Sequence, residues 1–108
     1  MRRGDLITVA VSGDYGKPRP AVVVQSDRLQ GTDSVIVCQL TSTLRDASSF
    51  RVTIEPSSQT GLRTTSQIMV DKMIAVHRSR CGGVIGRLEP TSQANLDSCL
   101  ALVLGLAD

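Results

Sequence analysis

The residues with the clearest chemical potential stand directly before one short apolar run. Lys17-Pro18-Arg19-Pro20 precedes Ala21-Val22-Val23-Val24, and because proline disfavours helical backbone for the residue before it, Lys17 and Arg19 are both held extended. The apolar run predicts a central strand buried on both faces, with Arg19 at its mouth. A guanidinium fixed there can hold two phosphate oxygens at once. A surface arginine in a proline-rich turn explains this stretch equally well.

A second polar group follows another apolar run. Val35-Ile36-Val37-Cys38-Gln39-Leu40 predicts a strand, and Thr41-Ser42-Thr43 comes directly after it. Side chains at strand ends are held more rigidly than side chains on loops, so these hydroxyls could be aimed at a ligand. For Thr41 by itself, a hydroxyl that only caps the strand is the simpler interpretation.

Length and composition indicate one domain, residues 1–108, with a substantial core. Apolar residues make up 41% of the chain, but only Tyr15 and Phe50 are aromatic, so Val, Leu, Ile and Ala must fill the core. The net charge of +2 is too small to imply a nucleic-acid partner. Among the twelve basic residues only Lys17 and Lys72 are lysines. This excess of arginine suits phosphate binding, although coding bias explains it equally well.

The sequence predicts neither a metal site nor acid–base catalysis by paired histidines. His77 is the only histidine and ends an apolar run, so no pair of histidines is available for acid–base catalysis. Cys38, Cys81 and Cys99 show no CxxC spacing that would predict a zinc site. We expect no cofactor, and reduced cysteines in a cytoplasmic protein. We expect no membrane association either, because the first apolar run is too short for a signal peptide or a membrane span.

The remaining pattern predicts a mainly β fold. The expected strands are Leu6–Val11, Pro20–Val24, Val35–Leu40, Phe50–Glu55, Gln67–Val76 and Val84–Leu88. Phe50–Glu55 alternates apolar and polar residues, which is typical of a strand with one buried and one wet face. Cys81-Gly82-Gly83 predicts a turn before the last strand.

A C-terminal helix is predicted to cap this small barrel-like sheet. Pro90 suits the first turn of a helix. The residues at helical spacing on one face are Leu96, Cys99, Leu100, Val103 and Leu104. Leu102 and Leu106 lie off this face, where they either widen it or cover a partner subunit.

The order of these features is that of a known family. The segments that carry the likeness are Arg3-Gly4-Asp5-Leu6, Arg19-Pro20-Ala21-Val22-Val23-Val24, Leu40-Thr41-Ser42, Gly61-Leu62-Arg63-Thr64-Thr65-Ser66 and the C-terminal leucine-rich helix. Together they resemble the MazF/PemK (Kid) family of bacterial toxins over essentially the whole chain. The resemblance implies a small SH3-like β-barrel of the MazF/CcdB toxin type, a homodimer, and a cognate antitoxin that blocks the active site.

The resemblance also implies the reaction. Family members are endoribonucleases, called mRNA interferases, that cut single-stranded mRNA at a short sequence without a metal ion. The 2′-hydroxyl attacks the adjacent phosphate, leaving a 2′,3′-cyclic phosphate and a 5′-hydroxyl. Carried over by motif, Arg19 and Thr41 are the catalytic residues. Donors aimed at the charge of a phosphorane-like transition state suit this role, whereas a guanidinium keeps its proton and is a poor general base.

Four further residues are predicted to bind RNA: Lys17, Ser42, Arg63 and Asp71. Ser42 and Asp71 match positions of the family, whereas Lys17 is chosen because it lies next to Arg19. Two of these assignments have plain alternatives. Lys17 could be a solvated loop lysine, and Asp71 could form a surface ion pair with a neighbouring base, Lys72 or Arg78.

At one position the chain departs from the family pattern. Kid-like members carry an arginine two residues before the acid that matches Asp71, and this chain has Met69 there. The role of that arginine is therefore vacant or filled by another residue. Arg63 and Arg51 are the candidates, and the sequence does not place either of them.

Two other functions compete with RNA cleavage. A gyrase poison of the CcdB kind would share the fold, but that family relies on a tryptophan in its C-terminal tail, and this chain contains no tryptophan. A catalytically silent RNA-binding member of the same fold would explain Met69. The presence of Arg19, Thr41 and Asp71 argues against this second alternative.

The scarcity of aromatic residues yields a first prediction. Single-stranded RNA is commonly bound by stacking bases on aromatic rings. With only Tyr15 and Phe50 available, binding should depend on contacts between arginine and phosphate and on hydrogen bonds to base edges. RNA cleavage at sub-saturating substrate should therefore fall steeply as salt rises from low to physiological concentration. A flat response in initial-rate measurements would contradict this picture.

Overall fold

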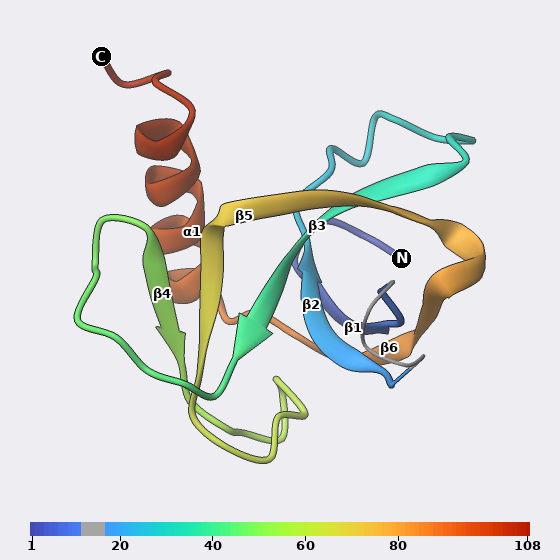
Figure 1. The fold of residues 1–108 in the computed structure, drawn as a ribbon, viewed down its shortest axis with the longest axis horizontal. Helices are drawn as coiled ribbons and strands as arrows, with labels where there is room; N and C mark the ends of the chain where they lie inside the picture. The colour runs from blue at the N-terminus through green and yellow to red at the C-terminus, as the bar shows by residue number, and fades with distance from the viewer. Residues whose placement is uncertain (12–16) are drawn as a thin grey trace.

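The computed structural model describes residues 1–11 and 17–108, which form one antiparallel sheet with a helix packed on one face (Figure 1). The elements are β1 (Asp5–Val9), β2 (Arg19–Val23), β3 (Ser34–Thr41), β4 (Arg51–Ile54), β5 (Ser66–His77), the 3₁₀ turn η1 (Arg78–Arg80), β6 (Cys81–Arg87) and α1 (Pro90–Val103). The strand order is β4-β5-β3-β2-β1-β6. The prediction of a mainly β fold with a C-terminal helix is confirmed. Tyr15 lies outside the described residues.

Strand β2 lies in the interior of the sheet, between β1 and β3, as its apolar run predicted. Successive residues of a strand point to opposite faces, so its side chains divide between two apolar clusters. Val22 belongs to the cluster that contains Leu96 of α1, whereas Ala21 and Val23 belong to the cluster on the other face. The strand is thus buried on both sides, and Arg19 stays exposed at its first position.

The sheet curls but does not close into the predicted barrel. Strands β4 and β6 form its two edges, and no pairing joins them within residues 1–11 and 17–108. The loop after β4 crosses to β6 instead, where the Arg87 amide donates to the Gln59 carbonyl at 2.8 Å. A Cβ on Gly86 would lie 2.1 Å from the Thr60 carbonyl oxygen. Glycine at this position therefore lets the loop lie directly on β6.

The predicted turn at Cys81-Gly82-Gly83 is wrong, because these residues begin β6. Cys81 pairs with Val9, and the pairing of β1 with β6 is interrupted by register shifts. A Cβ on Gly82 would lie 2.1 Å from the Thr8 hydroxyl oxygen. The glycine therefore permits a close approach within the sheet, and the chain reverses earlier, in η1.

Helix α1 begins at Pro90, as predicted, because proline in the first turn forfeits no intrahelical hydrogen bond. Its buried residues are Leu96, Cys99 and Leu100. Val103 and Leu104 were predicted on the same face, but their side chains are 37% and 50% exposed. The C-terminal end of α1 extends past β4 (Figure 1), and Leu104 lines a surface cavity that Ile36 of β3 and Met73 of β5 also line.

Leu102 and Leu106 are also exposed, so they do not widen the core face. The alternative, that they cover a partner subunit, stays a prediction. No helix among the described residues is long and apolar enough to cross a membrane.

The buried thiol of Cys38 makes stability depend on alkaline pH. Burial raises the pKa of Cys38 to about 11, and the neighbouring Cys99 and Asp71 add to the shift. The folded chain then holds this proton more tightly than the unfolded chain does. The stabilisation is complete below the unfolded pKa, near 9.0, and is lost as the pH rises through about 11.

We therefore expect the free energy of unfolding to fall more steeply between pH 9 and 11 in the wild type than in Cys38→Ala, by about 2–3 kcal/mol in total. Other titrating groups are common to both proteins and cancel in the difference. Urea titrations across this pH range measure the two slopes. Parallel slopes would contradict the assignment.

Candidate active site

The pairing of β2 with β3 brings the two predicted catalytic residues together. The register places Ala21 opposite Gln39, and Arg19 and Thr41 each lie two residues further along, at the start of β2 and at the end of β3. Residues two positions apart on a strand project from the same face. Arg19 and Thr41 share the face of Ala21, which α1 does not cover.

A surface cavity of about 440 Å³ lies at this pair, and we name it the Arg19–Thr41 cavity. Its lining residues are Arg19, Pro20, Gln39, Leu40, Thr41, Ser42, Thr43, Thr64, Ser66 and Met69. The polar groups among them are hydroxyls, one amide and one guanidinium. None of these described residues carries a carboxylate, so the cavity is suited to a negatively charged ligand.

The Thr41 hydroxyl oxygen is engaged by a hydrogen bond from within the chain. The Thr43 amide donates a hydrogen bond to Thr41 Oγ1 at 3.1 Å. Because the oxygen accepts from within the chain, the hydroxyl hydrogen can be donated to a ligand oxygen in the cavity. Arg19 is exposed at the start of β2 and can supply further donors from the opposite strand. The arrangement can therefore surround one phosphate group from two sides.

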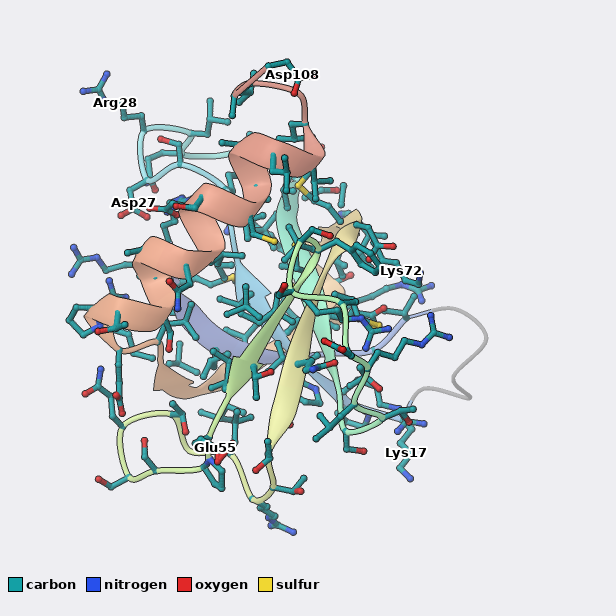
Figure 2. All side chains as sticks on the ribbon, turned by 90° about the vertical axis from the view of Figure 1, so that its left-hand side faces the viewer. Lys17, Asp27, Arg28, Glu55, Lys72 and Asp108 are labelled. Carbon is teal, nitrogen blue, oxygen red and sulfur yellow. The ribbon has the colours of Figure 1, made fainter. Side chains whose placement is uncertain are left out.

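The residues predicted to bind RNA are divided by the fold. Ser42 lines the Arg19–Thr41 cavity. Arg63 is exposed in the loop before β5, beside the cavity residue Thr64, but does not itself line the cavity. Lys17 is exposed just before β2 and projects on the side away from α1 (Figure 2).

Asp71 is placed elsewhere. The pairing of β3 with β5 is irregular here: Leu40 lies opposite Ile68, but Cys38 lies opposite Met73. Asp71 falls within this irregular stretch, where it pairs with Lys72 at 3.4 Å, as the plain alternative predicted. Burial raises the pKa of Cys99 in α1, and the Asp71 carboxylate raises it further. Asp71 is not among the residues that line the Arg19–Thr41 cavity.

The structure places Arg51, one of the two candidates for the role left open at Met69. Met69 lines the Arg19–Thr41 cavity, and Arg51 lies directly opposite it in the pairing of β4 with β5. Strict alternation placed Arg51 on a wet face, which is wrong, since only 8% of it is exposed. Its Nη1 donates to the Thr43 carbonyl and to Gln67 Oε1, both at 3.2 Å.

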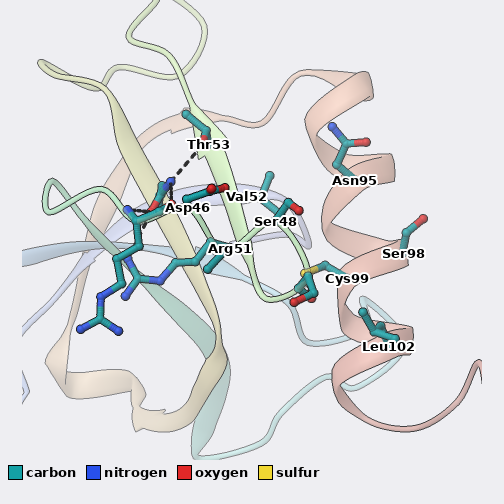
Figure 3. A pocket seen from close by; sticks show the side chains of 13 residues that line it. Asp46, Ser48, Arg51, Val52, Thr53, Asn95, Ser98, Cys99 and Leu102 are labelled. Carbon is teal, nitrogen blue, oxygen red and sulfur yellow. Dashed lines mark hydrogen bonds between the residues drawn. The ribbon is translucent and has the colours of Figure 1, made fainter.

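A second cavity of about 590 Å³ follows the outer edge of β4, between the preceding loop and α1 (Figure 3). Its lining residues are Arg45, Asp46, Ala47, Ser48, Ser49, Arg51, Val52, Thr53, Gln67, Asn95, Ser98, Cys99 and Leu102. None of the residues predicted for catalysis or RNA binding is among them. In the part of the chain that the structure describes, no three histidine, cysteine, aspartate or glutamate residues gather where they could hold a metal ion.

Comparison with known proteins identifies the family. A family model for PemK-like, MazF-like toxins of type II toxin–antitoxin systems matches residues 2–104. The chain belongs to this family. It is 44% identical over 108 residues to the probable endoribonuclease MazF of Mycolicibacterium smegmatis, and the match covers 99% of each chain. The prediction of a MazF/PemK-type endoribonuclease toxin is thereby confirmed at the level of the family.

Solved structures show the same fold. A mycobacterial endoribonuclease in complex with its cognate antitoxin superposes with a TM-score of 0.83 at 23% identity, covering 98% of this chain and 96% of that one. The toxin MazF-mt6 of Mycobacterium tuberculosis gives 0.80 at 18% identity, covering 94% and 96%. A MazE-MazF structure from Deinococcus radiodurans gives 0.76 at 22% identity, covering 98% and 97%. These matches confirm the predicted MazF-type fold.

Proposed function

We propose that this PemK/MazF-type toxin cleaves single-stranded mRNA at a short specific sequence, without a metal ion, in the cytoplasm. The observation that carries the proposal is that Arg19, at the start of β2, and Thr41, at the end of β3, line the same cavity. The cavity offers a guanidinium and a hydroxyl, and none of its described lining residues carries a carboxylate. Such donors stabilise the negative charge that develops on a phosphate during the reaction.

In the proposed reaction the 2′-hydroxyl attacks the adjacent phosphorus and the bond to the 5′ oxygen breaks. The products are a 2′,3′-cyclic phosphate and a 5′-hydroxyl. Arg19 donates two hydrogen bonds to the non-bridging oxygens, and Thr41 donates one from the other side. Both stand at strand ends, so little reorganisation is needed as the charge develops.

The proposed partners follow from the same family. A cognate antitoxin, like that in the mycobacterial complex, would cover the Arg19–Thr41 cavity, and the toxin would act as a homodimer. Ser42 is proposed to contact the RNA within the cavity, and Lys17 and Arg63 beside it. Asp71 is proposed to reach RNA only through a partner subunit or another part of a long substrate, because it does not line the Arg19–Thr41 cavity.

The function is tested by incubating the purified protein with a long RNA in EDTA, beside single- and double-stranded DNA, and mapping ends by primer extension. We expect discrete cuts with 5′-hydroxyl ends in the RNA and intact DNA. Intact RNA from a folded protein would overturn the proposal in favour of a silent member of the fold. A gyrase inhibition assay would then test the CcdB-like alternative.

Replacing Arg19 by alanine should lower turnover by about a hundredfold or more, because a preorganised donor to the developing charge is lost. The chain should still fold, since Arg19 is exposed at the start of β2. Single-turnover cleavage at saturating RNA measures the effect. Arg28→Ala removes the same charge from an exposed loop (Figure 2) and serves as the matched control. Near-normal cleavage by folded Arg19→Ala would remove Arg19 from the mechanism.

A further inference from the structure

Arg51 is a buried cation that the fold does not neutralise. It begins edge strand β4 and is only 8% exposed. Its hydrogen-bond acceptors are the Thr43 carbonyl and the Gln67 side-chain oxygen, both neutral, and its Nε has no partner among the described residues. A charge buried without a carboxylate is unfavourable for folding. Stability therefore does not explain an arginine at this position.

Gln67 extends the contacts of Arg51 into the loop after β3. The Arg45 amide donates to Gln67 Oε1 at 2.9 Å, and Gln67 Nε2 donates to the Arg45 carbonyl at 2.9 Å. Nε2 also donates to Thr53 Oγ1 at 3.2 Å on the neighbouring strand (Figure 3, dashed). The backbone at Arg45 is thus tied to the sheet through one buried side chain. Arg51 shares its Oε1 acceptor and so belongs to the same network.

The other end of the network reaches the candidate active site. Thr43 is held at both of its backbone polar groups: its amide donates to Thr41 Oγ1 at 3.1 Å, and its carbonyl accepts from Arg51 Nη1 at 3.2 Å. Thr43 therefore links the buried guanidinium to the Thr41 hydroxyl through two hydrogen bonds. Arg51 extends from β4 on the side away from α1 (Figure 3), which is also the face of Met69 in the cavity lining.

We propose that Arg51 is a positioning residue for RNA cleavage. It fixes the backbone of Thr43, and Thr43 in turn fixes the Thr41 hydroxyl in the orientation that donates into the Arg19–Thr41 cavity. This inference rests on the proposed function. Arg51 does not touch the scissile phosphate, so it acts on the rate of the chemical step and not on the affinity for RNA.

The test is a double-mutant cycle between Arg51→Met and Thr41→Val. Methionine keeps an apolar stem but removes the donors, and valine removes only the hydroxyl. Arg51→Met should lower the single-turnover rate at saturating RNA by about tenfold to a hundredfold, the effect of a misplaced catalytic group. Its Kd should stay within about threefold of the wild-type value, measured with an uncleavable RNA that carries 2′-deoxyribose at the cut site.

The decisive comparison uses the Thr41→Val background. If Arg51 acts through the Thr41 hydroxyl, adding Arg51→Met there should lower the residual rate no further than about twofold. The proposal would be overturned if the fold-losses in cleavage rate of the two single variants multiplied in the double variant. A loss of RNA affinity with an unchanged cleavage rate would overturn it as well. Arg28→Met is the charge control and should match the wild type.

Arg51→Lys keeps the test valid if Arg51→Met does not fold. An ammonium can donate to the Thr43 carbonyl but lacks the planar fork, so Arg51→Lys should cleave RNA more slowly than the wild type. In the Thr41→Val background, adding Arg51→Lys should leave the cleavage rate unchanged. A wild-type rate for folded Arg51→Lys and Arg51→Met would overturn the positioning role. Failure of the wild type itself to cut RNA would instead refute the proposed function, so the two failures are distinguishable.

Discussion

The antiparallel pairing of β2 with β3 is the constraint on which the candidate site depends. One register aligns Ala21 with Gln39, and it brings the start of β2 and the end of β3 to one cavity, which Arg19 and Thr41 line. A shift of one residue would send one of the two side chains to the opposite face, because side chains alternate along a strand. The buried clusters on both faces of β2 hold this register, since any slip would expose apolar residues. Core packing and active-site geometry are therefore set by the same contacts.

The division of the sheet into two faces explains where the chemistry lies. Helix α1 covers one face and completes a core with residues such as Val22 and Ile68. The other face is covered only in part, and at the ends of β2 and β3 it opens into a cavity lined with hydroxyls. Asp71 falls where the pairing of β3 with β5 is irregular, and it does not line this cavity. The irregular pairing of two strands thus influences which of the predicted site residues lie at the cavity.

Local patterns predicted what local physics controls. The apolar runs at Ala21–Val24 and Val35–Leu40 became interior strands, and Pro90 began the helix. Patterns failed where a contact between distant segments decides the outcome. Gly82 looked like part of a turn, but its missing side chain serves a close approach to Thr8. Alternation placed Arg51 in solvent, because the sequence does not reveal that the Thr43 carbonyl and Gln67 supply buried acceptors.

Proline constraints and short apolar runs act over a few neighbouring positions, so they were enough to predict the mainly β architecture. The order of the motifs indicated the family, and Arg19 and Thr41 were assigned through that resemblance. Contacts between distant segments bring these two residues to one cavity, leave Asp71 outside its lining and bury Arg51 opposite Met69. Strand register and burial depend on contacts between segments far apart in the chain. Such contacts leave no periodic signal in the sequence of either segment.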